Sequence, residues 1–264
     1  MWRVWTSTLR FTTAPKSSTA KLPVFCTYNL SSLDPQSHAR MRFAARNLLR
    51  SQADLVCLQE ISSAPGFLPI FQQTYLEGHF PYGLGPVGND PRGMNLAVLS
   101  RYPILDWASH ADDSFPLLDG SRSSRFSRDL LRLDWRCGSQ VWRIFCTHLK
   151  SMRGGPAAHR QRESEAAAIL AILTAQTDDR PWLLLGDLND QPESPTLQRL
   201  LQSPLDLRNS LPPGKTTFPC RGSRHQFDYI LYPGRMEISL VNSRVWPESR
   251  ASDHAMVSAT FDFP

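Results

Sequence analysis

Polar residues of the kind that bind metal ions and activate water stand at the ends of several apolar segments of this chain. Residues 182–185 are Trp-Leu-Leu-Leu, which predicts a buried strand, and a glycine at 186 interrupts the run. Asp187 and Asn189 follow at i and i+2, so their side chains can share one side of the strand end. Such groups are costly to bury and more often mark a site than packing. An Asx-type turn is the alternative for this pair taken alone.

The same arrangement recurs along the chain. The further polar residues that end, interrupt or precede an apolar strand pattern are Asn29, Glu60, His148, Asp228 and the pair Asp253–His254. If these strand ends meet at one edge, their side chains form a single carboxylate-rich pocket.

In this order the segments resemble the endonuclease/exonuclease/phosphatase superfamily, the deoxyribonuclease I-like phosphoesterases. The resemblance runs from about residue 22 to the C-terminus and rests on Tyr28-Asn29, Leu58-Gln59-Glu60, Thr147-His148-Leu149, Gly186-Asp187-Leu188-Asn189, Phe227-Asp228-Tyr229 and Ser252-Asp253-His254. Residues 93–101 and the sequence Ser127-Arg128-Asp129 are similar to bacterial members. The resemblance implies a four-layer α/β sandwich of two packed mixed sheets flanked by helices. Residue patterns alone predict only a mixed α/β protein with many strands.

Hydrolysis of a phosphodiester by this family implies a bound Mg²⁺ or Mn²⁺. These hard cations prefer oxygen ligands, usually one or two carboxylates with several retained waters. Glu60 is the first candidate ligand, Asn29 can add a carbonyl oxygen beside it, and Asp253 can complete the site from the opposite sheet.

Hydrolysis also requires a base for the attacking water, and Asp187 is the candidate. The resemblance assigns this role to Asp187 and phosphate binding to Asn189. A protonated His254 can hydrogen-bond a phosphate oxygen, and by analogy with the family Asp228 orients its ring. His148 resembles a second histidine of the deoxyribonuclease and sphingomyelinase branches, either an acid for the leaving group or another phosphate donor.

Three further residues are candidates for contact with the substrate phosphate. Arg128 belongs to the Arg-Asp pair that similar bacterial sequences share, and guanidinium groups bind phosphate in a bidentate manner. Lys150 follows His148 closely, and Asn95 lies on the predicted strand at 94–100. The neighbouring Arg122 and Arg132 are expected to be solvated surface charges.

Composition is compatible with an anionic substrate. The 264 residues carry a formal net charge of +5 at pH 7, which suits a nucleic-acid backbone without requiring one. The predicted function is therefore a Mg²⁺/Mn²⁺-dependent phosphodiesterase, a nuclease on DNA or RNA. The alternatives are a phosphatase or sphingomyelinase-like lipid phosphodiesterase, and, from another class, a non-catalytic binding module on the same scaffold.

One catalytic domain is predicted over 22–264, preceded by a flexible extension at 1–21. That extension is rich in Arg, Ser and Thr and contains no acidic residue, a composition similar to organellar transit peptides. The five cysteines are an odd number without a CxxC pair, which argues against structural zinc and favours a reducing compartment, the cytoplasm. No apolar run approaches the roughly 20 residues of a membrane span.

The elements expected to position these residues alternate along the chain. Helices are predicted over 36–52, from Pro156 to about 175, and from Pro195 onward. Strands are predicted near 23–29, 55–60, 94–100, 103–110, 129–136, 140–147, 181–186, 216–218, 227–232, 237–244 and 255–262.

Overall fold

Two six-stranded sheets packed face to face form the centre of the computed structural model, which describes residues 21–222 and 224–264. Sheet A contains β1 (Val24–Leu33), β2 (Leu55–Ser62), β3 (Tyr82–Leu84), β4 (Met94–Ser100), β13 (Ser239–Trp246) and β14 (Met256–Asp262), in the order β13-β14-β1-β2-β4-β3. Sheet B contains β5 (Ile104–Ser109), β8 (Leu130–Cys137), β9 (Gln140–His148), β10 (Trp182–Asp187), β11 (Leu207–Asn209) and β12 (Asp228–Pro233), in the order β11-β12-β10-β9-β8-β5.

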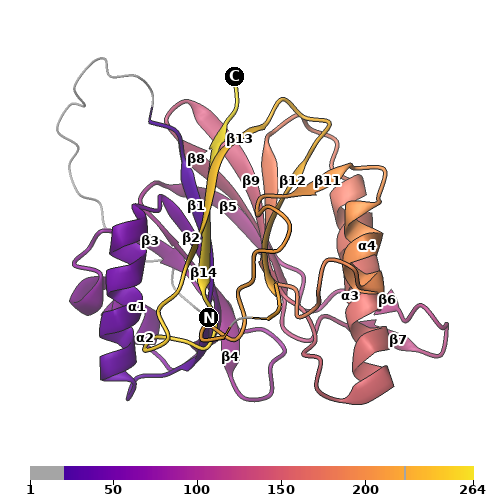
Figure 1. Cartoon of the computed structure of the whole chain (residues 1–264), viewed down its shortest axis with the longest axis horizontal. Coiled ribbons are helices and arrows are strands. Elements are labelled where there is room, and N and C mark those ends of the chain that lie inside the picture. Colours follow the sequence, from indigo (N-terminus) through magenta and orange to yellow (C-terminus); the bar gives the residue numbers. More distant parts are fainter. Residues whose placement is uncertain (1–20, 223) are drawn as a thin grey trace.

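Helices cover the outer face of each sheet. Helix α1 (His38–Ser51) lies on sheet A, whereas α3 (Gly155–Thr174) and α4 (Pro195–Leu201) lie on sheet B (Figure 1). Two short turns of helix, α2 (Phe67–Ile70) and η1 (Phe71–Tyr75), and a hairpin of β6 (Ser114–Pro116) with β7 (Ser123–Arg125) complete the elements. Both sheets are mixed, because β1 and β10 each pair with one parallel and one antiparallel neighbour. The expected four-layer α/β sandwich is confirmed.

Apolar side chains fill three layers between these elements. Phe25 of sheet A packs between Trp135 and Trp142 of sheet B, with ring centroids 5.3 and 5.1 Å away. Further buried side chains lie beneath α1 and beneath α3 and α4. Aromatic pairs across the two sheets fix how the sheets stack, and therefore how their strand ends meet.

Strand β10 occupies the centre of sheet B, and all six of its residues are buried. A side chain at Gly186 would be impossible, because a Cβ there would lie 2.0 Å from the carbonyl oxygen of Thr147 on β9. The glycine thus permits close approach of the two parallel strands directly before Asp187.

The chain from 216 to 218 differs from its prediction as a strand. It forms one isolated bridge, between Phe218 and His225, and no strand. The hydroxyl of Thr217 accepts hydrogen bonds from the backbone N–H groups of Phe227 and Asp228, so the segment is held as a loop across the start of β12. Residues 62–92 contain α2, η1 and β3; Phe67, Phe71 and Phe80 pack inward, whereas Ile70 and Val87 are exposed.

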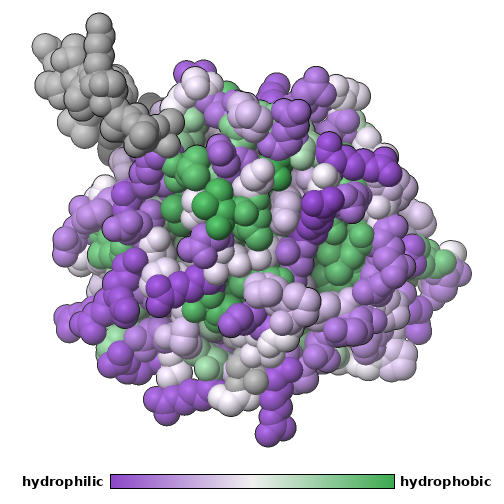
Figure 2. Space-filling view, turned by 45° about the horizontal axis from the view of Figure 1, so that its top comes forward, coloured by the Kyte–Doolittle hydropathy of each residue, from purple (hydrophilic) through white to green (hydrophobic). Residues whose placement is uncertain are grey.

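The surface away from these layers mixes polar and apolar side chains. Figure 2 shows separate hydrophobic patches divided by hydrophilic atoms on the face it presents. Within the described ranges, the helices are all too short or too polar to cross a bilayer. The predicted extension lies outside the described residues except for Lys21, which pairs with Asp54 at 2.8 Å.

Candidate active site

The two sheets deliver polar side chains to one edge of the sandwich. Parallel pairing of β1 with β2 brings Asn29 beside Gln59, directly before Glu60. In sheet B, Asp187 is in register with His148 on β9 and with Asp228 on β12. The edge therefore gathers strand ends that lie far apart in the sequence.

Asp187 is the point at which the two sheets meet. The Nδ2 of Asn29 on sheet A donates to its Oδ2 at 2.8 Å, and the backbone N–H of Asn189 donates to its Oδ1 at 2.8 Å. The Nε2 atoms of His148 and His254 lie 3.4 and 3.8 Å from the same Oδ2. Burial raises the pKa of Asp187 to about 7, with the charge of Asp228 adding to the effect and that of His254 opposing it.

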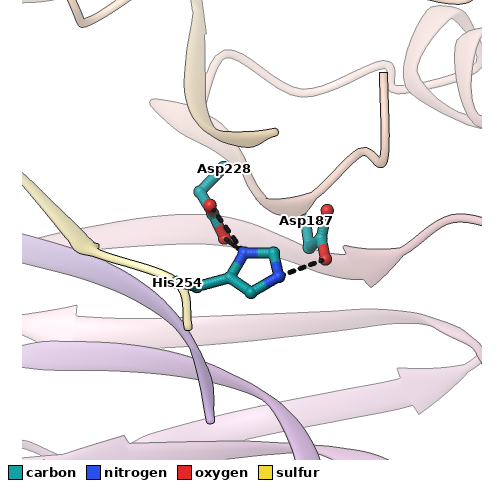
Figure 3. A group of neighbouring side chains, drawn as sticks. All are labelled: Asp187, Asp228 and His254. Atoms are coloured by element: carbon teal, nitrogen blue, oxygen red, sulfur yellow. Dashed lines mark hydrogen bonds and ion pairs between the residues drawn. The ribbon is translucent and has the colours of Figure 1, made fainter. Parts of the chain in front are cut away.

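His254 lies between two carboxylates (Figure 3). Its Nδ1 is 2.9 Å from Oδ2 of Asp228, and its Nε2 faces Asp187. The ring of Phe218 packs against it at a centroid distance of 4.7 Å. Burial opposes the charged imidazolium, but the charges of Asp228 and Asp187 outweigh it and raise the pKa of His254 to about 10. At neutral pH the ring is therefore a cation with a donor on each nitrogen.

His148 has the opposite character. It is 3% exposed, and its pKa is lowered well below the ordinary value, first by burial and then by the charge of Arg128. The two histidines that flank Asp187 thus differ in charge at neutral pH, one protonated and one neutral.

Glu60 lies on the open side of the site, with 16% of its side chain exposed. Ser32 donates to its Oε2 at 2.8 Å, and the guanidinium of Arg92 is 3.5 Å from its Oε1. Four site positions, Ser31, Ser32, Glu60 and Asn189, have positive φ angles of 49°, 59°, 57° and 50°. Non-glycine residues adopt such angles at a cost of about 1–3 kcal/mol each, and they concentrate at functional sites.

A divalent cation fits the Glu60 side of the edge better than the histidine side. Asp187, Asp228 and His254 offer ligand atoms within 4.8 Å of one another. However, the Nδ1 of His254 is bonded to Asp228 at 2.9 Å and its Nε2 faces Asp187, so both ring nitrogens are already engaged. Glu60 and the Oδ1 of Asn29, which also accepts from Ser31 N–H at 2.8 Å, are the oxygen donors that Mg²⁺ prefers.

The predicted phosphate-binding residues lie around the same edge. Arg128 is 7% exposed, and it donates to Asp90 at 3.2 Å and to the carbonyl of Leu149 at 3.1 Å. The same carbonyl accepts from Nδ2 of Asn189 at 3.1 Å. Asn95 is 4% exposed, and its Nδ2 has no hydrogen-bond partner among the described residues. This donor is therefore free to bind a water or another acceptor.

Asp253 and Lys150 are placed differently from the rest. The side chain of Asp253 is exposed, and among the described residues it makes no hydrogen bond or ion pair, although its neighbour His254 is buried. The two residues lie in a bend directly before β14, which turns Asp253 outward and His254 toward Asp228. Lys150 is half-buried, and its backbone N–H donates to Glu165.

Two residues of the site were missed by the sequence analysis, Asp90 and Arg92. Asp90 is 7% exposed and holds Arg92 through both oxygens, at 3.1 and 2.8 Å, as well as Arg128. Both residues belong to a loop rich in Gly and Pro, where no periodic pattern distinguishes a functional side chain from a solvated one. An Asp and an Arg two residues apart within such a loop were the available signal.

The chain belongs to the Endonuclease/Exonuclease/phosphatase family, whose sequence model matches residues 26–254. Members of this family are phosphoesterase hydrolases and include nucleases and phosphatases. No curated protein matches the sequence.

Solved structures share the fold at low sequence identity. The human Nocturnin catalytic domain with bound sulfate has a TM-score of 0.72 at 19% identity and covers 92% of this chain and 95% of its own. A humanized D. rerio TDP2 has a TM-score of 0.69 at 15% identity, covering 91% and 98%. An endonuclease/exonuclease/phosphatase from Bacteroides vulgatus has a TM-score of 0.67 at 15% identity, covering 92% and 100%. These likenesses establish the fold.

Proposed function

We propose that this protein is a Mg²⁺- or Mn²⁺-dependent phosphodiesterase that cleaves DNA or RNA. The observation that carries the proposal is the environment of Asp187. One buried carboxylate is contacted by an amide from sheet A, by a neutral histidine and by a protonated one. Purely structural packing of a strand end does not require such a set of groups.

Glu60 and Asn29 hold the cation in this proposal, with Asp253 as a third, more exposed ligand. Their oxygen chemistry, the partial exposure of Glu60 and the strained backbone at positions 31, 32 and 60 support the assignment. When bound, the cation polarises phosphate oxygens and stabilises charge on the leaving oxygen.

Asp187 orients and deprotonates the attacking water. A pKa of about 7 leaves a substantial fraction ionised at neutral pH and makes the carboxylate a stronger base than an exposed aspartate. Its hydrogen bonds to Asn29 and to the backbone of Asn189 fix its orientation.

Donors surround the place where phosphate charge develops. His254, kept protonated and oriented by Asp228, donates to a non-bridging oxygen. His148, Asn189, Arg128, Asn95 and Lys150 supply further donors, and the free amide of Asn95 supports this role most directly.

Nucleic acid is the preferred substrate because the chain carries net positive charge and because arginines lie beside the site. The sulfate in the human Nocturnin domain is a tetrahedral oxyanion, as a phosphate is. A lipid substrate is less favoured, because Phe67 and Phe71 of residues 62–92 pack inward and leave only Ile70 and Val87 as large apolar residues exposed on that segment. The five cysteines are free, which fits action in a reducing compartment.

A substrate panel tests the proposal. Supercoiled plasmid, single-stranded RNA, sphingomyelin vesicles and p-nitrophenyl phosphate are each incubated with the protein in Mg²⁺, with parallel reactions in EDTA and with Asp187→Asn. We expect EDTA-sensitive cleavage of plasmid or RNA by the wild type alone. Faster turnover of sphingomyelin or the monoester would establish one of the alternative enzymes. No turnover of any member by a folded sample would establish a non-catalytic module.

A further inference from the structure

Helix α3 carries two charged residues that are completely buried, Arg162 and Glu165. They stand three positions apart, on the helix face that also buries Ala158, Ala166 and Ile169. Burial of charged side chains is costly unless each one is paired or fully hydrogen-bonded. Their partners therefore indicate what the two charges do.

Glu165 binds two active-site segments at once. Its Oε1 accepts from the backbone N–H of Ser127 at 2.7 Å, and its Oε2 accepts from the backbone N–H of Lys150 at 2.7 Å. Gln161 completes the set with a third donor at 3.0 Å. One segment leads directly into Arg128, and the other follows the carbonyl of Leu149.

Arg162 binds the second of these segments and a third one. Its Nη1 donates to the carbonyl of Lys150 at 3.2 Å, and its Nε donates to Oδ2 of Asp190 at 2.8 Å. Asp190 follows Asn189 in the chain. Glu165 thus binds the backbone N–H of Lys150, and Arg162 binds its backbone carbonyl.

The carbonyl of Leu149 lies at the centre of this arrangement. It accepts from Nη1 of Arg128 and from Nδ2 of Asn189, each at 3.1 Å, and the N–H of Leu149 donates to the backbone carbonyl of Asp187 at 3.0 Å. A shift of the 149–150 peptide would move the side chains of Arg128 and Asn189 together.

We propose that Glu165 and Arg162 are positioning residues, a buried pair on α3 that sets the placement of Arg128 and Asn189 through the segments at 127, 149–150 and 190. The proposal rests on the proposed phosphodiesterase function. Neither side chain touches the substrate. The pair lies behind sheet B and acts on the phosphate-binding side of the site, and it leaves Glu60 and Asn29 of sheet A untouched.

Glu165→Gln is the sharpest variant, because a carboxamide has one oxygen where the carboxylate uses two. The backbone N–H of either Ser127 or Lys150 then faces an NH₂ group, which cannot accept a hydrogen bond, and that segment loses its contact with α3. Loss of a residue that orients a metal ligand typically costs about 10- to 100-fold in affinity or activity, and by analogy we expect kcat to fall by about that factor. The Mg²⁺ concentration for half-maximal activity should stay unchanged.

Ser164→Ala is the matched control on the same helix. Ser164 is 1% exposed and accepts from the backbone N–H of Leu118 at 3.0 Å, away from the site. Its loss removes a buried hydrogen bond to a backbone N–H but should leave kcat unchanged. An equal loss of kcat in Ser164→Ala would show a general effect of loosening α3 and would overturn the proposal.

Double-mutant cycles separate positioning from general stability. The penalty of Glu165→Gln should shrink strongly in a background with both Arg128→Ala and Asn189→Ala, since the positioned groups are gone, and should persist in full with Glu60→Gln. Equal penalties in the two backgrounds would refute the proposal. If Glu165→Gln does not fold, Arg162→Lys is used in the same cycles. Lysine keeps the positive charge but lacks the guanidinium group that contacts Asp190 and the carbonyl of Lys150 together.

If the wild-type protein shows no turnover, the proposed function is refuted. The positioning role of Glu165 and Arg162 can then still be tested by phosphate binding. Titration calorimetry with orthophosphate in Mg²⁺ measures the phosphate-binding side directly. Weaker binding by Glu165→Gln than by Ser164→Ala supports positioning, and equal binding contradicts it.

Discussion

The two halves of the active site are built differently. The sheet B half consists of His148, Asp187 and Asp228, which are 3, 1 and 0% exposed. The sheet A half presents Glu60, whose side chain is 16% exposed and is bonded to Ser32 and approached by Arg92. The sheet B half is buried and densely hydrogen-bonded, whereas in the sheet A half Glu60 is partly exposed beside the buried Asn29.

This difference follows the chemistry proposed for each half. Proton transfer and stabilisation of phosphate charge are strongest where water is excluded and donors are already oriented, as in the sheet B half. A hard cation keeps several of its waters, and Glu60, unlike Asp187, is a carboxylate that water can reach. Variants in the two halves should therefore fail in different ways.

Asp187→Asn should produce the largest loss of activity. Removal of a general base lowers kcat by about 10²–10⁴-fold. At pH 8 the variant should melt at the same temperature as the wild type or higher. The raised pKa of Asp187 in the wild type shows that burial disfavours its ionised carboxylate, and the neutral asparagine avoids that cost. Turnover of bis(p-nitrophenyl) phosphate and thermal melting by circular dichroism measure both effects. Retention of most activity would remove Asp187 from the mechanism.

Glu60→Gln should alter the metal requirement more than the chemistry. A neutral amide binds a divalent cation less strongly than a carboxylate, so we expect the half-saturating Mg²⁺ concentration to rise about tenfold or more. Activity should recover in part at high Mg²⁺, in contrast to Asp187→Asn. An unchanged Mg²⁺ titration would place the cation elsewhere.

The pH profile reports on Asp187 and on His254, which contacts it. Asp187 acts when deprotonated, so the rate should rise as pH increases through about 7, and His254 acts when protonated, so the rate should fall through about 10. Asp228→Asn removes the charge that raises both pKa values, and both limbs should move to lower pH. If the fall in rate at high pH is unchanged in Asp228→Asn, Asp228 does not raise the pKa of His254.

Asp253→Asn should give the smallest effect. An exposed charge contributes about 0.2–1 kcal/mol, so the Mg²⁺ requirement should rise by less than about fivefold. A rise as large as that of Glu60→Gln would make Asp253 a principal ligand.

Much of this site could be predicted from the sequence because each polar residue ends or interrupts an apolar strand pattern. Asn29, Glu60, His148, Asp187 and Asp228 were found in that way, and the family resemblance predicted that they meet. The sequence alone does not reveal that Asn29 would bond Asp187, 158 residues away, since the contact depends on how two sheets stack.

Arg162 and Glu165, which lie behind the site, were missed for a different reason from Asp90 and Arg92. Most of their contacts are with backbone groups of distant segments, which no side-chain pattern encodes. Charged residues on the apolar face of a predicted helix were the signal that could have identified them. The exposure of Asp253 was equally hidden, because it depends on a bend before β14 that the sequence pattern does not show.

Hydrolysis of bis(p-nitrophenyl) phosphate under a change of metal tests the central claim most directly. We predict turnover by the wild type in Mg²⁺ or Mn²⁺ that stops in EDTA, resumes when Mg²⁺ is restored and is absent in Asp187→Asn. Turnover that survives EDTA, or that persists in Asp187→Asn, would contradict a single site in which sheet A holds the cation and sheet B activates water.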